Sequence, residues 1–75
     1  MLLVKFERLQ QRLSQDVVGL VAHIPQPIIS LIECGRLVPT PAQLERLAKA
    51  LNVQPPEALL EPVTSVGTER RVSSR

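Results

Sequence analysis

Apolar residues recur at helical spacing along most of this chain, and prolines and glycines interrupt the pattern. The clearest stretch contains Leu44, Leu47, Ala48 and Leu51, whose i, i+3, i+4, i+7 spacing places all four on one face of a helix. The whole pattern predicts five short helices, over about 3–12, between Ser14 and Ile24, between Pro25 and Gly35, over 41–51 and over 55–60. We therefore expect an all-α fold, a compact bundle of five short helices.

The first predicted helix carries an apolar stripe of Phe6, Leu9 and Leu13, which should cover the middle of the bundle. Two basic residues, Arg8 and Arg12, are four positions apart and are expected to project together from this helix. Such an edge is either a solvated basic surface or a phosphate contact.

The second and third predicted helices are joined by a short turn. Ser14 is a suitable N-cap for the second helix, and Val18 and Ala22 give that helix an inward face. Pro25 ends the helix, because a proline disfavours helical geometry in the residue before it. Gly35 then ends the third helix. Two helices joined in this way form a helix-turn-helix, whose second helix can enter the major groove of DNA.

The third helix has two different faces. Ile29, Ile32 and part of Ile28 lie on one side of the helical wheel and are expected to pack inward. The opposite side should be presented to a partner, and it carries Gln26, Pro27, Ser30 and Leu31.

Several spaced positions carry a family resemblance: Ser14-Gln15, Ala22, Ile29-Ser30, Ile32-Glu33, Gly35, Pro39 and Leu47–Val53. From about Phe6 to Leu60 the chain resembles the Cro/lambda-repressor-type (XRE) helix-turn-helix family. The resemblance implies a sequence-specific DNA-binding transcriptional regulator of bacterial or phage type.

The resemblance also implies roles for single residues. Gln15 would hold a DNA phosphate, and the exposed face of the third helix, with Gln26, Pro27, Ser30 and Leu31, would touch bases. In this family the loop after the third helix often reaches phosphates, which implies such a contact for Arg36. The last helix frequently forms a dimer contact, which implies that Leu59 or Leu60 faces a partner while the other closes the core.

Two residues stand where the family usually has glycine. His23 occupies the turn between the second and third helices, and Asn52 follows the fourth helix. Both residue types tolerate the left-handed backbone conformation better than most, so we expect both turns to form.

The composition adds limits. In 75 residues, 44% of them hydrophobic and one of them aromatic, we expect one helix-turn-helix domain over 1–62 and a flexible basic tail over 63–75. A single cysteine, Cys34, excludes an internal disulfide and is too little for a structural zinc site.

The apolar segment at the start of the sequence is too short for a signal peptide or a membrane span. We expect a soluble cytoplasmic protein, with no membrane association, no cofactor and no enzymatic activity.

The charges favour nucleic acid less strongly than the net charge of +2 implies. From residue 1 to 62 six basic residues balance six acidic ones, and the excess lies in the tail with Arg70, Arg71 and Arg75 against Glu69. Because phosphate contacts supply most non-specific DNA affinity, the domain should bind DNA as a homodimer or with help from its tail.

A second hypothesis comes from apolar residues at positions expected to be exposed. Val17 and Leu20 point away from the inward face of the second helix, and Leu31 and Val38 add to the apolar surface. Exposed apolar patches mark interaction sites. The alternative is a helix-turn-helix domain used for protein binding, as in an antitoxin-like or phage-encoded modulator, and Leu20 is also a candidate for the homodimer contact.

Overall fold

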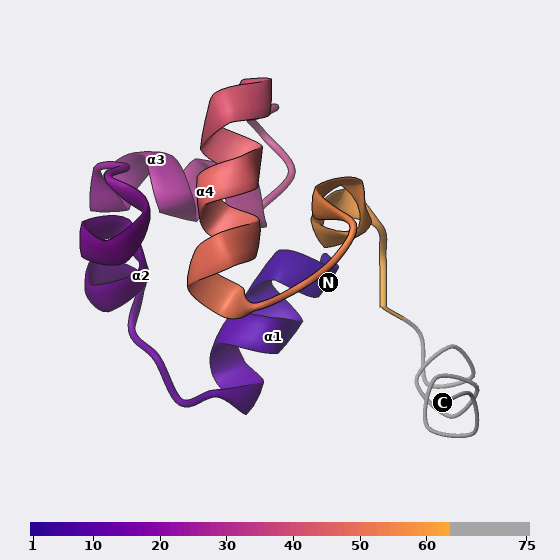
Figure 1. Cartoon of the computed structure of the whole chain (residues 1–75), viewed down its shortest axis with the longest axis horizontal. Helices are drawn as coiled ribbons and strands as arrows, with labels where there is room; N and C mark the ends of the chain where they lie inside the picture. Colours follow the sequence, from indigo (N-terminus) through magenta and orange to yellow (C-terminus); the bar gives the residue numbers. More distant parts are fainter. Residues whose placement is uncertain (64–75) are drawn as a thin grey trace.

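The computed structural model describes residues 1–63, and the chain in this part is helical (Figure 1). Its elements are α1 (Leu3–Gln10), α2 (Gln15–Ala22), α3 (Gln26–Glu33), α4 (Pro41–Leu51) and the 3-10 helix η1 (Pro56–Leu60). The all-α prediction is confirmed, with four α-helices and one 3-10 helix in place of five α-helices. The tail predicted over 63–75 lies, from residue 64 on, outside the described residues.

The predicted helix boundaries have their expected chemistry. The Ser14 hydroxyl accepts the N–H of Val17 at 3.1 Å. At the start of α4, the Gln43 N–H donates to the Thr40 hydroxyl at 3.2 Å, and the Gln43 side-chain oxygen accepts the Thr40 N–H at 3.0 Å. These reciprocal bonds form a capping box.

The two turns without glycine also form as predicted. His23 ends α2 with φ 59° and Asn52 ends α4 with φ 60°, both in the left-handed region. Gly35 has φ 75° after α3, which is the conformation expected of a glycine that ends a helix.

The core forms where α4 packs against α2, α1 and η1, and α2 also packs against α3 (Figure 1). The inward faces predicted for α2, α3 and α4 are confirmed, because the apolar residues assigned to these faces are buried, with Ile28 partly so. The buried apolar residues are Val4, Val18, Ala22, Ile24, Ile29, Ile32, Leu44, Leu47, Ala48, Leu51 and Leu59.

The inward stripe predicted for the first helix is wrong at Leu9, whereas Leu13 packs against the core as expected. Val4 and Arg8, four residues apart, point inward, whereas Leu9 is 48% exposed. The helix also ends at Gln10 and not at Arg12, because Arg12 adopts a left-handed turn with φ 60°. The Gln11 side chain then donates to the Leu51 carbonyl at 2.7 Å, which ties the end of α1 to the last turn of α4.

The first and last described residues are hydrogen-bonded together. Leu3 donates its N–H to the Glu61 carbonyl, and Val63 donates to the Met1 carbonyl, both at 2.8 Å. This pairing holds η1 against α1 and leaves Leu59 fully buried, with Leu60 only partly buried. Leu59 therefore closes the core, and the expectation that it could face a partner is wrong for this residue.

Within residues 1–63, no single helix is both long and apolar enough to cross a membrane. Only α2 and α3 counted together reach that length and composition, and they are bent by 109° at their junction.

Candidate nucleic-acid interface

The junction between α2 and α3 fixes the relative orientation of these two helices. They meet at 109°, within the range typical of a helix-turn-helix. The buried Ile24 donates its N–H to the Gly19 carbonyl at 2.9 Å, which closes the turn on the last part of α2. A Cβ atom at Gly19 would lie 2.5 Å from the Ile24 carbonyl oxygen. Glycine is therefore required here for the turn to approach the helix so closely.

A side chain from α4 supports the same junction. Arg46 donates from Nε to the Ala22 carbonyl at 2.7 Å, at the C-terminus of α2. A cation at this end is favourable, because the last carbonyls of a helix carry partial negative charge. In the sequence, Arg46 lies between the inward positions Leu44 and Leu47, beside the charged residue Glu45, a pattern typical of a solvated helix face. The side chain is half-buried and bound to α2, so it is not part of a solvated surface.

A chain of polar side chains links the starts of α2 and α3 to α1. Gln26 donates from Nε2 to Gln15 Oε1 at 2.6 Å, and Gln15 donates from Nε2 to Glu33 Oε1 at 2.9 Å. Arg8 donates to both oxygens of Glu33, at 2.7 and 3.2 Å, and to the Leu13 carbonyl at 2.8 Å. We call Arg8, Glu33, Gln15 and Gln26 the polar network. It gives the two glutamines a fixed position relative to each other.

The position of Arg8 corrects the sequence-based expectation. Arg8 was expected to project from α1 together with Arg12, but it is only 8% exposed and forms a buried ion pair with Glu33. Arg12 is exposed. Buried charges are found paired because an isolated one is strongly disfavoured in the interior. Arg8 therefore stabilises the polar network, and the expectation that it contacts a phosphate is wrong.

The remaining candidate residues lie on accessible parts of the helix pair and its flanking loops. Pro27 and Leu31 are exposed on α3, and Gln26 and Ser30 are half-buried beside them. Arg36 is exposed in the loop after α3. At the starts of α2 and α3, an open hollow of about 470 Å³ is lined by Gln15, Gln26, Arg8, Ser14 and Asp16.

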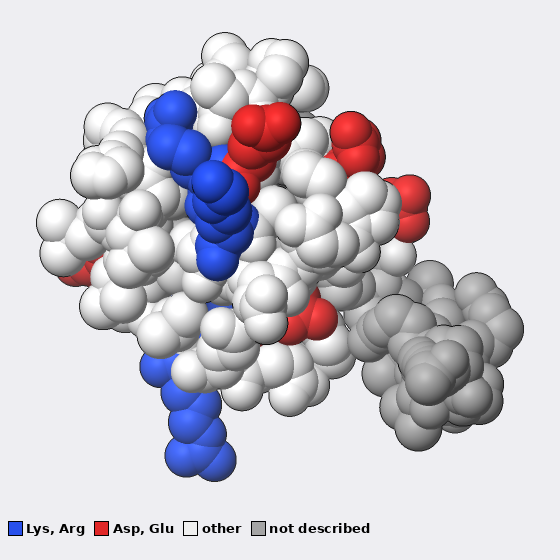
Figure 2. All heavy atoms as spheres, in the orientation of Figure 1, with Lys and Arg blue, Asp and Glu red and all other residues white. Residues whose placement is uncertain are grey.

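Charge is distributed unevenly around this surface. From Leu13 to Gly35 the sequence contains no lysine or arginine, so the helix pair itself supplies neither of these cations. Figure 2 shows basic side chains gathered over α4, with acidic ones directly beside them, and a second basic group near the connection of α1 and α2. In the sequence, the exposed arginines nearest to the helix pair are Arg12, which precedes it, and Arg36, which follows it.

A family model described as a helix-turn-helix domain matches residues 4–61. The chain belongs to the helix-turn-helix domain family. The match reaches from the second residue of α1 to just past η1, so the resemblance to the Cro/lambda-repressor-type family seen in the sequence is confirmed. Comparison of this helix-turn-helix protein with curated proteins and with solved structures gave no match.

Proposed function

We propose that this helix-turn-helix protein is a sequence-specific DNA-binding transcriptional regulator that places α3 in the major groove. The hydrogen bond between Gln15 and Gln26 carries the proposal. It couples a side chain at the start of α2, where a phosphate would bind, to a side chain at the start of α3, where bases would be read. A contact to the DNA backbone then also orients the residue that reads the sequence.

The bond leaves Gln26 able to read a base. One N–H of its side-chain amide is used on Gln15, and the amide oxygen and the second N–H remain. Adenine offers a matching donor and acceptor in the major groove, so adenine is the expected base. The exposed Pro27 and Leu31 suit apolar contact with thymine methyl groups. With so few hydrogen-bonding groups on α3, we expect DNA shape to supply a large part of the specificity.

Backbone contacts are assigned to Gln15, Arg36 and Arg12, with Ser30 at the edge of the reading face. Few phosphate contacts per copy mean low affinity per copy. We therefore propose a homodimer, whose two α3 helices would lie about 34 Å apart and enter successive major grooves on one side of the duplex.

Three alanine variants test the assignment of roles, measured by selection of bound sequences from a random DNA library. Arg36→Ala should weaken binding to all sequences alike, because a phosphate contact carries no sequence information. Gln26→Ala should reduce the discrimination between bases at one position of the site by about 1–3 kcal/mol. Gln15→Ala should do both, because it also removes the partner of Gln26. The same loss of discrimination in all three variants would contradict these roles.

One observation favours a second candidate function, the binding of another protein. The outer face of α2 exposes Val17, Leu20 and Val21, and the helix pair lacks lysine and arginine. An antitoxin-like or phage-encoded modulator would use such a face. In that case the full chain would not bind duplex DNA at low salt, and Gln26→Ala would not change its affinity for the partner protein.

A further inference from the structure

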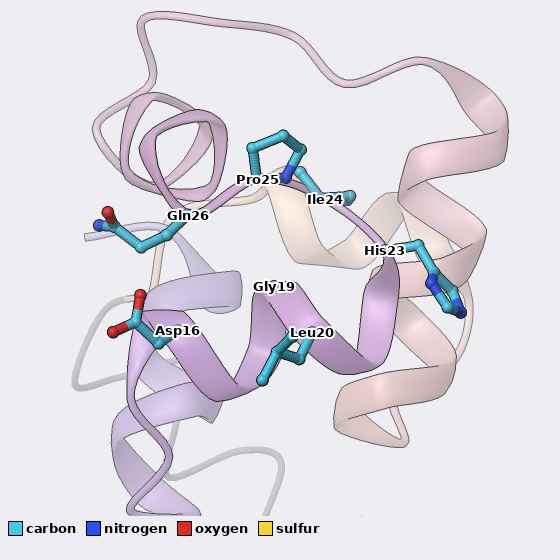
Figure 3. A pocket seen from close by; sticks show the side chains of 7 residues that line it. All are labelled: Asp16, Gly19, Leu20, His23, Ile24, Pro25 and Gln26. Carbon is cyan, nitrogen blue, oxygen red and sulfur yellow. The ribbon is translucent and has the colours of Figure 1, made fainter.

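The outer face of α2 has an ordered arrangement of side chains. Leu20 is 77% exposed, and Val17 and Val21 beside it are 42% and 59% exposed. Asp16 comes four residues before Leu20 and His23 three residues after it, which places the three on one side of the helix. Both Asp16 and His23 are exposed, and Figure 3 shows them at opposite ends of α2 with Leu20 between them. We call Asp16, Val17, Leu20, Val21 and His23 the α2 face.

An open hollow of about 710 Å³ lies beside Leu20 (Figure 3). Gly19 contributes to its lining, and Ile24, Pro25 and Gln26 line the side toward α3. Because a Cβ atom at Gly19 would collide with the Ile24 carbonyl, no larger side chain can fill this part of the hollow. The hollow is therefore a fixed feature of the helix pair, next to an exposed leucine of the same surface.

We propose that the α2 face binds the α2 face of a second copy of this chain, with the two helices antiparallel and the two-fold axis at Leu20. Along a helix that rises 1.5 Å per residue, Asp16 lies about 6 Å before Leu20 and His23 about 4.5 Å after it. In the antiparallel pair, Asp16 of each copy therefore faces His23 of the other. The two leucines meet at the axis, and each lies at the edge of the other copy's hollow.

The polar groups at the two ends of α2 select a second copy as the occupant, because the Asp16 carboxylate can accept a hydrogen bond that the His23 imidazole can donate. An acidic group at one end of α2 and a histidine at the other, at nearly equal distances from Leu20, make the face complementary to itself after a two-fold rotation. The helix dipoles also oppose each other in this arrangement, because the N-terminus of each helix lies beside the C-terminus of the other. A parallel pair would instead place the two Asp16 carboxylates side by side.

This inference rests on the homodimer of the proposed function and not on its DNA-binding part. It names the surface through which two copies would associate. Sedimentation of the 75-residue chain in the absence of DNA tests it, so a failure here is distinguishable from a failure to bind DNA.

The first experiment compares Leu20→Glu with Val38→Glu. Both residues are strongly exposed, so both variants should fold, which a thermal melt checks. Leu20→Glu should raise the dimer dissociation constant on the order of tenfold or more, because it places two carboxylates at the axis. Val38→Glu, outside the α2 face, should dimerise like the parent. Dissociation by Leu60→Glu with none by Leu20→Glu would move the interface to η1 and overturn the inference while leaving the homodimer intact.

A charge exchange tests the antiparallel register. His23→Asp alone should weaken the dimer, because it faces Asp16 of the other copy with a second carboxylate, and aspartate tolerates the left-handed turn at this position. Asp16→His combined with His23→Asp should restore dimerisation, since the opposite pairs form again with their places exchanged. A double variant as weak as His23→Asp would overturn the register. A parent chain that stays monomeric at millimolar concentration, or that binds a different protein through Leu20, would overturn the proposal itself.

Discussion

The polar network and the outer face of α2 differ in how firmly their side chains are held. At the start of α2, Gln15 is held by hydrogen bonds to Glu33 and Gln26. On the outer face of the same eight-residue helix, Leu20 and Val21 are more than half exposed. Side chains that read DNA need a fixed geometry, and in the proposed function the buried ion pair between Arg8 and Glu33 would supply it. The apolar side chains on the outer face of α2 are exposed and therefore suit contact with a partner surface.

The largest expected effect is the loss of the ion pair that anchors the polar network. Glu33→Ala should lower the free energy of unfolding by about 3–5 kcal/mol, because it leaves the Arg8 guanidinium buried without its partner. Urea denaturation measures the change. Glu45→Ala, which removes an exposed glutamate of α4, is the matched control and should change stability by less than about 0.5 kcal/mol.

A paired replacement sharpens this prediction. Arg8→Met combined with Glu33→Leu should recover most of the stability lost in Glu33→Ala, because apolar residues of similar volume can replace a buried ion pair. The same double variant should lose DNA binding if the network positions Gln15. Full DNA binding by the double variant would mean that the polar network has no role in recognition.

Emptying the core should have the next largest effect. Ile29→Ala and Leu47→Ala remove side chains that are 1% and 0% exposed, and each should cost about 2–4 kcal/mol of unfolding free energy. Leu20→Ala removes the same kind of side chain from the outer face of α2 and should cost less than about 0.5 kcal/mol in the monomer. Thermal melts at low protein concentration separate the two classes. Equal melting temperatures for Ile29→Ala and Leu20→Ala would contradict the inward face of α3.

Much of the fold is predictable from the sequence, because its signals are local. The caps at Ser14 and Thr40 and the left-handed turns at His23 and Asn52 each depend on residues a few positions apart. The inward faces of α2, α3 and α4 follow from the helical period alone.

The rest depends on contacts between distant residues. Arg8 shares the inward side of α1 with Val4, but an arginine is buried only with a partner, and Glu33 is 25 residues away. Arg46 likewise finds its acceptor 24 residues away, at the end of α2. Leu9 differs in the opposite direction. Its helical spacing predicts burial, but an apolar side chain at such a position can remain exposed. The sequence therefore does not predict the polar network, although it indicates both Gln15 and Gln26 as candidate residues.

The most direct test of the central claim is a salt titration of duplex DNA binding by the full chain and by Arg36→Ala, followed by fluorescence anisotropy. We predict that the parent binds DNA at low salt. The logarithm of its association constant should fall linearly with the logarithm of the salt concentration. Arg36→Ala should reduce the slope by about 0.9 per protomer, the value for one lost phosphate contact. An absence of DNA binding at low salt, or the same slope for both proteins, would contradict the account of this helix-turn-helix as a DNA-binding surface.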